Sequence, residues 1–255
     1  MKKSGQVSIF VIIAIFIVVI LIIFFLVKRN NDIDSSEKLF TSEISSIDST
    51  LEGCLYENGV YSIWTIGLQG GRINLSEPYL KTNISYVSYG YYLGQKTLAS
   101  KKQIEDETNV FLNALMQLCI IEEDFDSINI TSGIPKVSTK IKTDSVDFNL
   151  KFSITLKKGE RTYTINKDYS TEIPIRFGEV YDVAQEIIQK EIDDPNSIDL
   201  SYLTSLDYDI NIIPYSQNTF IYVITDYKSK IKDIPYSFEF AVKTKKWKIN
   251  MKKMI

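Results

Sequence analysis

The chain contains no histidine among its 255 residues. Histidine is the general base of Ser-His-Asp and Cys-His sites and the commonest metal ligand in proteins, so its absence excludes these classes of active site. The sequence also lacks a Walker loop, a Gly-x-Gly-x-x-Gly fingerprint and a nucleophile elbow. We therefore expect no enzyme activity, no cofactor and no metal ion.

Cysteine is almost as scarce, with Cys54 and Cys119 as the two examples. Their separation provides neither a Cys-x-x-Cys redox pair nor a zinc site. Each lies late in a segment with helical periodicity, beside a leucine. In an oxidising compartment the two would form a disulfide that closes a loop of about 65 residues and contributes about 4 kcal/mol. We favour this disulfide over the alternative of two separate buried thiols.

Basic residues are outnumbered, with 29 Lys and Arg against 32 Asp and Glu. Four of the basic residues flank one long apolar run, which leaves 25 against 32 and a net charge of −7 for the rest of the chain. This charge disfavours nucleic acid as a partner, because binding to nucleic acid depends on neutralising phosphates. The apolar share of 44% and the charged share of 24% are typical of a globular domain.

The long apolar run covers residues 9–27, behind a polar leader of residues 1–8. As a helix it would extend about 28 Å, close to the hydrocarbon thickness of a bilayer. It exceeds the apolar core of a cleavable signal peptide, which has about 7–15 residues, and no small-x-small cleavage site follows it. We therefore predict a single transmembrane helix at 9–27 that anchors the chain in the lipid bilayer.

The orientation in the membrane is predicted from the chemistry of the body that follows the span. Basic residues on the two sides of the run are nearly balanced, so the positive-inside rule does not decide the question. The body carries both cysteines and three Asn-x-Ser/Thr glycosylation candidates, at Asn74, Asn83 and Asn129. Together these features favour a protein of the cell membrane with its C-terminal body outside the cell, facing envelope or surface proteins as partners.

The leader itself has a recognisable pattern: a charged stretch, a small residue and Gln-x-Ser before the long apolar helix. It resembles the class III-type signal of archaeal pilin-like proteins, and the resemblance implies cleavage between Gly5 and Gln6. The pilin pattern usually places a glutamate shortly after the cut, where this chain has Phe10. An uncut signal anchor is the alternative interpretation, and both stay open.

Hydrophobic periodicity predicts an α+β fold for the body. Three- and four-residue spacings predict helices over 33–55 with a turn at 67–71, from about residue 103 to 123, and from about 178 to 193. Alternating spacings predict strands, at 84–92, 146–156, 161–166, 208–213, 220–225 and 236–242. The transmembrane helix is thus followed by an ectodomain in which helices pack on one face of an antiparallel sheet.

This pattern also divides the body by composition. Residues 28–135 form a helical, cysteine-containing, membrane-proximal part, and residues 136–255 form a β-rich α+β part. Whether these are one domain or two stays open. Within the second part, Asp207, Asp209 and Asn211 alternate along a strand and offer oxygen ligands of the kind that calcium takes, but we interpret them as the solvated face of a half-buried strand.

Short motifs recur over almost the whole chain: Gly5–Phe10, Cys54-Leu55, Gly67–Gly71, Cys119, Ile173–Arg176, Asp194-Pro195, Ile213–Tyr215, Ile224–Asp226 and Pro235-Tyr236. With these motifs the chain resembles a family of uncharacterised single-pass membrane proteins of DPANN archaea. The resemblance implies display at the cell surface and supplies no chemistry.

Three functional hypotheses follow from these observations. The first is a membrane-anchored extracytoplasmic domain of unknown role, non-catalytic, that binds a partner or contributes to the envelope. The second is a pilin-like filament subunit. The third is an extracytoplasmic enzyme that depends on carboxylates alone.

Overall fold

The computed structural model describes the backbone of residues 5–83, 85–121, 128–195 and 197–245. Side chains at 5–13, 26–40, 43, 120 and 121 lie outside this description. By its internal contacts the chain divides into two units, Met1–Ser49 and Thr50–Ile255. Helices and strands both make up the second unit, so the α+β prediction is confirmed.

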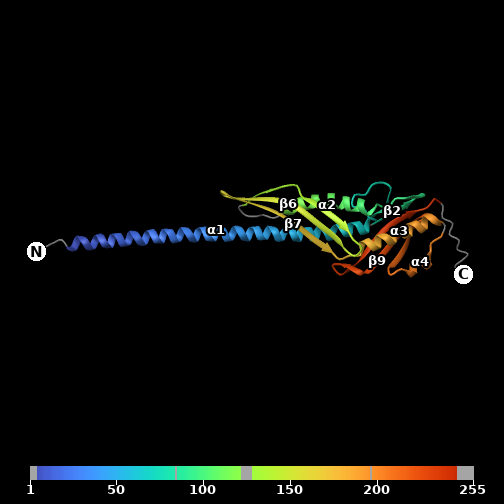
Figure 1. Ribbon diagram of the computed structural model, residues 1–255. Helices are drawn as coiled ribbons and strands as arrows, with labels where there is room; N and C mark the ends of the chain where they lie inside the picture. The colour runs from blue at the N-terminus through green and yellow to red at the C-terminus, as the bar shows by residue number, and fades with distance from the viewer. Residues whose placement is uncertain (1–4, 84, 122–127, 196, 246–255) are drawn as a thin grey trace. The chain divides into compact units, whose positions relative to one another are not determined.

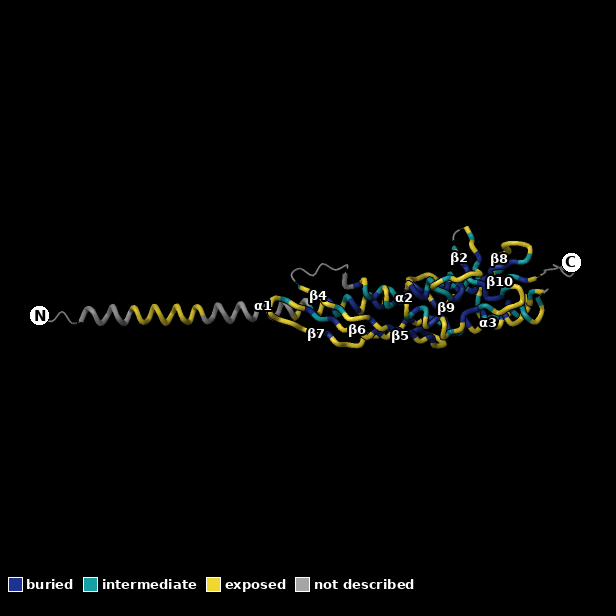
Figure 2. The backbone as a smooth tube through the Cα atoms, turned by 90° about the horizontal axis from the view of Figure 1, so that it is seen from above, coloured by how far each residue is buried: buried dark blue, intermediate teal, exposed yellow. Residues whose placement is uncertain are grey.

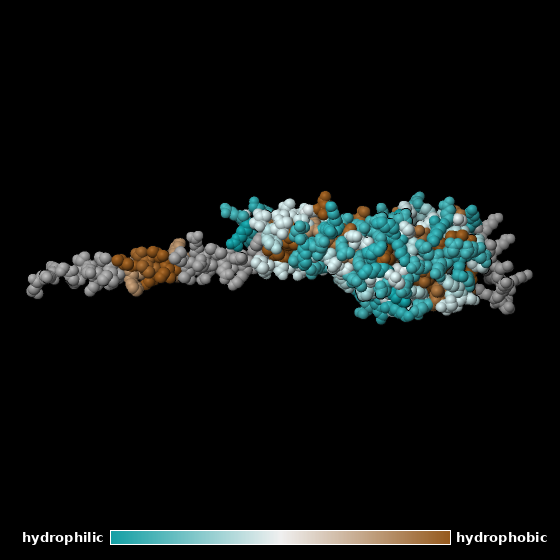
Figure 3. Space-filling view, in the orientation of Figure 1, coloured by the Kyte–Doolittle hydropathy of each residue, from teal (hydrophilic) through white to brown (hydrophobic). Residues whose placement is uncertain are grey.

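One helix, α1 (Gly5–Leu68), covers both the predicted apolar run and the predicted amphipathic helix. Residues 14–25 are all apolar and all exposed, and because they complete more than three turns they make every side of the helix apolar. Figure 3 shows the face of this stretch that is turned to the viewer in the hydrophobic colour. Among the helices as far as their side chains are described, none is both long enough and apolar enough to cross a membrane. The predicted span 9–27 extends beyond the described side chains at both ends, so it stays a prediction.

In the second unit, the smaller of two sheets is built on a long hairpin of β6 (Val146–Lys158) and β7 (Arg161–Ile173). Two short strands, β4 (Asn129–Ser132) and β5 (Lys136–Ile141), pair with successive lengths of the other edge of β6. Every second residue of β6 from 146 to 156 is buried. The predicted hairpin is confirmed, but β7 extends beyond the predicted strand at 161–166. The second half of β7 buries only every fourth residue, and this spacing lacks the alternation from which a strand is predicted.

Three side chains on one face of α2 (Lys101–Ile121) accept hydrogen bonds from the backbone of β5. The bonds join Ile141 N to Glu105 Oε1 at 3.0 Å, Thr139 N to Asn109 Oδ1 at 2.6 Å and Val137 N to Asn113 Oδ1 at 2.7 Å. Four residues along a helix advance about 6 Å and two residues along a strand about 6.6 Å, so acceptors and donors stay in step. The helix thereby covers a sheet edge that would otherwise offer its amides to another strand.

We expect Asn109→Ala to lower the free energy of unfolding by about 1–3 kcal/mol, because it leaves the Thr139 amide without its acceptor. Urea denaturation of the full-length protein in detergent measures the loss. Asp106→Ala is the matched control: it makes the same kind of truncation on α2 and removes only an exposed ion pair with Lys102, worth less than about 0.5 kcal/mol. Equal losses in the two variants would contradict the role of Asn109 as an edge acceptor.

The larger sheet has the strand order β1-β2-β10-β9-β8, with β3 pairing with β2. Its strands are β1 (Tyr79–Lys81), β2 (Tyr86–Tyr92), β3 (Gln95–Lys96), β8 (Asp209–Ser216), β9 (Thr219–Ile231) and β10 (Ile234–Lys243). Among these described strands, β2 and β10 are the parallel pair and the other neighbours are antiparallel.

The expectation of one antiparallel sheet is therefore corrected: there are two sheets, and one is mixed. The physical reason is distance along the chain. Antiparallel neighbours joined by a tight turn leave a local signature, whereas a parallel pair needs a long crossover that sequence periodicity does not record. Residues 93–233 separate β2 from β10.

The larger sheet curves until its two ends approach each other. Tyr215, on the edge strand β8, donates a hydrogen bond to the carbonyl oxygen of Lys81 on β1 at 2.7 Å, although these strands stand at opposite ends of the strand order. The curved face encloses a small apolar cluster of its own, made of Leu80, Val87, Tyr89, Ile221 and Ala241. These five residues are buried, whereas Asn211 and Ile213 of β8, which pair with β9 on the same face, are exposed.

Helices pack against both sheets (Figure 1). The larger sheet carries α3 (Phe177–Asp193), whose Phe177 ring lies 5.9 Å from that of Phe238. The short α4 (Leu200–Ser205) follows α3. Within the second unit, α1 approaches both sheets at glycines: Gly59 faces Phe148 of β6, and Gly67 faces the backbone of β10. Figure 2 shows buried backbone running through the strands of both sheets and along α3.

Candidate binding pocket between α3 and α4

The connection between α3 and α4 gathers acidic residues. α3 ends at Asp193, and the proline at 195 disfavours helical backbone at Asp194. The carboxylate of Asp199 then accepts a hydrogen bond from Tyr202 N at 3.0 Å and so caps α4. The helix end, the turn and the cap therefore place Asp193, Asp194 and Asp199 around one short connection.

This connection borders an open depression of about 700 Å³. Its lining is Lys190, Glu191, Asp193, Asp194, Ser197, Ile198, Asp199, Leu200 and Ser201. Beside it lies a cavity of about 10 Å³, large enough for one water-sized group, which shares Lys190, Glu191, Ile198 and Asp199 with the depression. Four carboxylates against one ammonium give this region a negative charge.

Glu191 is the buried residue of this region, with 3% of its surface exposed. Tyr222 of β9 donates a hydrogen bond to Glu191 Oε1, and no described protein group donates to Oε2. Burial raises the pKa of Glu191 to about 7, with the hydrogen bond from Tyr222 opposing the rise and the charge of Asp194 adding to it. Leaving Oε2 without a donor costs about 1–3 kcal/mol, which a water or a ligand that donates to it would recover.

The ammonium group of Lys190 makes two stabilising contacts in this region. Its Nζ donates to Asp199 Oδ2 at 3.0 Å and lies 4.2 Å from the centre of the Tyr202 ring. The first contact is an ion pair and the second a cation–π contact. The pKa of Asp199 is lowered, first by the hydrogen bond from Tyr202 N and then by Lys190.

The raised pKa of Glu191 predicts that stability falls as the pH rises from about 5 to about 7. In this window the folded protein keeps a proton on Glu191 that the unfolded chain releases, so the folded state loses up to about 3 kcal/mol relative to the unfolded state, and the loss levels off above pH 7. Urea denaturation at intervals across this range measures the slope. Glu191→Gln, which cannot titrate, is expected to flatten this component, and an unchanged slope in that variant would contradict the assignment.

A second charged cluster joins the start of α3 to β9. Arg176 donates from Nε and Nη2 to the two carboxylate oxygens of Asp226, which is fully buried. Ser229 Oγ also donates to Asp226. Burial alone would raise the pKa of Asp226, but the hydrogen bonds from Arg176 and Ser229 outweigh burial and lower it. This carboxylate is saturated, so we interpret the cluster as structural.

The aspartates considered as calcium ligands lie beside this cluster. Asp207 pairs with Lys228 and lies 3.9 Å from Arg176 Nη1, and Asp209 accepts from Asn211 Nδ2 at 3.4 Å. Asp207, Asp209 and Asn211 are exposed, as expected for a solvated face. Across the part of the chain that the structure describes, no group of three or more carboxylate or thiol side chains is arranged to hold a metal ion.

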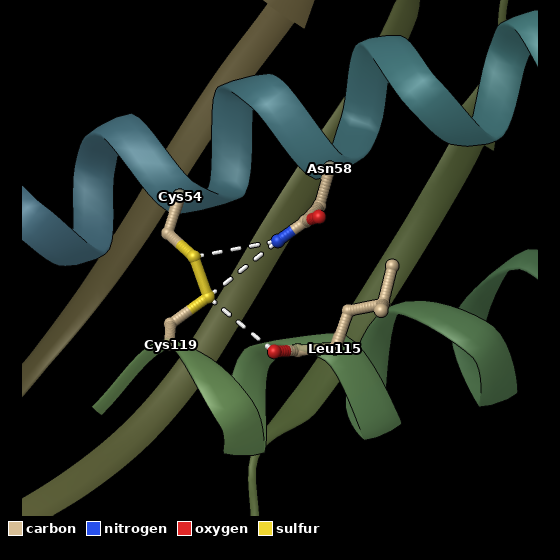
Figure 4. The surroundings of a disulfide bond; sticks show 4 residues. All are labelled: Cys54, Asn58, Leu115 and Cys119. Carbon is tan, nitrogen blue, oxygen red and sulfur yellow. Dashed lines mark hydrogen bonds between the residues drawn. A yellow bond between two sulfur atoms is a disulfide. The ribbon is translucent and has the colours of Figure 1, made fainter. Parts of the chain in front are cut away.

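The predicted disulfide between Cys54 and Cys119 is confirmed (Figure 4). The two Cα atoms are 6.4 Å apart, and the bond joins α1 to α2 as expected. Asn58 Nδ2 lies 3.3 Å from Cys54 Sγ and 3.5 Å from Cys119 Sγ and donates to both. Cys119 Sγ also lies 3.3 Å from the carbonyl oxygen of Leu115.

The remaining predicted site residues, which are the glycosylation candidates and the cleavage point, are not part of the pocket lining. The glycosylation candidates Asn74, Asn83 and Asn129 are all exposed, as glycan attachment requires, and their modification stays a prediction. The predicted cleavage point between Gly5 and Gln6 falls at the first residue of α1, next to residues 1–4, which lie outside the description.

Sequence reasoning missed Glu191. One signal was present: Glu191 follows Ala184, Ile187 and Ile188 at the three- and four-residue spacing of the buried face of α3. A glutamate on an apolar stripe indicates a buried carboxyl group. Its partner Tyr222 belongs to a strand that joins the site only through tertiary packing, so no local pattern reveals the pair.

No protein-family model, curated protein or solved structure matches the chain.

Proposed function

We propose that this chain is a single-pass membrane protein whose body lies outside the cell and serves in binding or in envelope structure, without catalysis. The lipid bilayer is its partner through residues 9–27, and the body faces envelope or surface proteins. Kinship with the surface proteins of DPANN archaea is part of the same proposal.

The main observation behind this proposal is the exposed apolar stretch of α1 at residues 14–25. An apolar surface on every side of a helix favours immersion in lipid, because water penalises each exposed apolar side chain. The disulfide supports an external body, since disulfides persist in oxidising compartments. The exposed glycosylation candidates agree with the same location.

Membrane fractionation with an alkaline wash tests the anchor. We expect the full-length protein to stay in the washed pellet and Ile17→Lys/Ile20→Lys to move to the supernatant, because a lysine near the centre of a span costs about 3 kcal/mol. Ile17→Leu/Ile20→Leu is the matched control and is expected to stay in the pellet. Protease treatment of intact cells then tests the side: degradation of the body supports an external location, and protection contradicts it.

A pilin-like filament subunit is the second candidate, favoured by the continuity of α1 from the apolar stretch into the body. Such a helix provides the shared core along which subunits stack. Intact mass measurement tests this candidate, since cleavage between Gly5 and Gln6 removes residues 1–5. Filaments in shed surface material, seen by electron microscopy, would support it further, and an uncut chain without filaments would contradict it.

A further inference from the structure

We propose that the depression between α3 and α4 binds an alkylammonium group, with the ammonium beside Glu191 and its carbon chain in the depression. This inference deepens the binding role proposed above and rests on it, but the pocket can be tested without reference to the membrane. The shared chemistry is a primary amine on a methylene chain, as a free polyamine or the lysine side chain of a partner protein supplies it.

Charge is the first argument. The depression is lined by Glu191 and three aspartates, and its single cation, Lys190, is already held by Asp199. An incoming cation therefore meets net negative charge. A phosphate or carboxylate ligand would meet repulsion instead.

The second argument is the buried oxygen Glu191 Oε2, to which no described protein group donates a hydrogen bond. When the carboxyl group is ionised, the form that a neighbouring cation favours, such an oxygen calls for a donor. Tyr222 fixes the other oxygen, so the carboxyl group is held in place before a ligand arrives. An ammonium has three N–H donors, enough to serve Oε2 and neighbouring oxygens at once.

Size is the third argument and favours an ammonium over a guanidinium. The cavity beside Glu191 has room for one water-sized group, which fits an ammonium head and is too small for a planar guanidinium. The described residues provide no cluster of three or more carboxylates arranged for a metal ion. The walls of the depression also include Ile198 and Leu200, which suit methylene groups.

Lys190 provides an internal precedent. Its own ammonium, on a four-carbon chain, is stabilised by one carboxylate and one aromatic face in this same region. A second alkylammonium would donate to Glu191 Oε2, the buried oxygen of this region that has no described donor. The pairing of ammonium, carboxylate and tyrosine is therefore already realised once in the pocket wall.

Isothermal titration of full-length protein in a nonionic detergent tests the proposal, with n-butylammonium as the probe and n-butanol as its uncharged match. We expect saturable binding of n-butylammonium, none of n-butanol, and at least tenfold weaker binding to Glu191→Gln, which keeps the shape and removes the charge. Asp168→Asn is the matched control; Asp168 is an exposed carboxylate on β7 that pairs with Lys151, and its loss should leave the affinity unchanged.

Two further probes separate the sources. Tighter binding of spermidine than of Nα-acetyl-lysine methyl ester indicates a free polyamine, and the reverse order indicates a lysine side chain; either order supports the ammonium site. Absence of saturable amine binding, equal affinity in Glu191→Gln, or binding of calcium in place of amines would each overturn it. Because the titration uses detergent-solubilised protein, its failure leaves the membrane-fractionation result standing, and the reverse also holds.

Discussion

Gly67→Ala is expected to lower the free energy of unfolding by about 3 kcal/mol, the largest loss we predict for adding a single methyl group. A Cβ at this position would lie 2.4 Å from the carbonyl oxygen of Ser237 and 3.0 Å from the ring of Tyr236. The first obstacle is the backbone of β10, which cannot rotate away as a side chain can. The helix and the sheet must therefore move apart, at the expense of the core between them.

Gly53→Ala is the matched control, because it makes the same change in the same helix. Nothing lies within 4 Å of a Cβ built on Gly53, and alanine is the better helix former by about 0.5–1 kcal/mol. This variant is expected to be more stable than the native protein. Urea denaturation of both variants measures the difference, and effects of the same sign would contradict the close packing of α1 on β10.

Cys54→Ser/Cys119→Ser is expected to cost about 4 kcal/mol of stability. The disulfide closes a loop across 65 residues of sequence separation, and on the chain-entropy view a loop of this length restricts the unfolded chain by about that amount. Thermal unfolding compares the double variant with the native protein, each with and without a reductant.

The reductant provides the internal control for this prediction. It should lower the melting temperature of the native protein toward that of the double variant and leave the variant unchanged. A native protein insensitive to a reductant that demonstrably opens the bond would contradict a stabilising role. Asn58, which donates to both sulfurs, can donate equally to serine hydroxyls, so the variant tests the covalent link more than the hydrogen bonds.

The elements that the sequence predicted well are those with local causes. Residues close together in the sequence determine the periodicity of α2 and α3, the turn at the paired glycines after α1 and the alternation along β6. Gly70 and Gly71 indeed have positive φ values, of 69° and 83°, as a turn after a helix requires. The pairing of the cysteines was predictable because two such residues leave a single possible bond.

The features that escaped prediction have partners far away along the chain. The parallel pairing of β2 with β10 joins strands that are far apart in the sequence, and the contact between Tyr222 and Glu191 depends on the packing of α3 against the larger sheet. The acceptors Asn109 and Asn113 look like ordinary polar positions of a helix until β5 is placed beside them. In each case the partner residue or strand lies at least 24 residues away along the chain.

The link between Cys54 and Cys119 also sets the shortest covalent path for tension that enters the body through α1 and leaves it after Cys119. Residues 55–118, with β1, β2, β3 and most of α2, lie outside that path and cannot be drawn out into extended chain while the bond lasts. Opening the bond would lengthen the chain under tension by up to about 200 Å, at roughly 3.3 Å per extended residue.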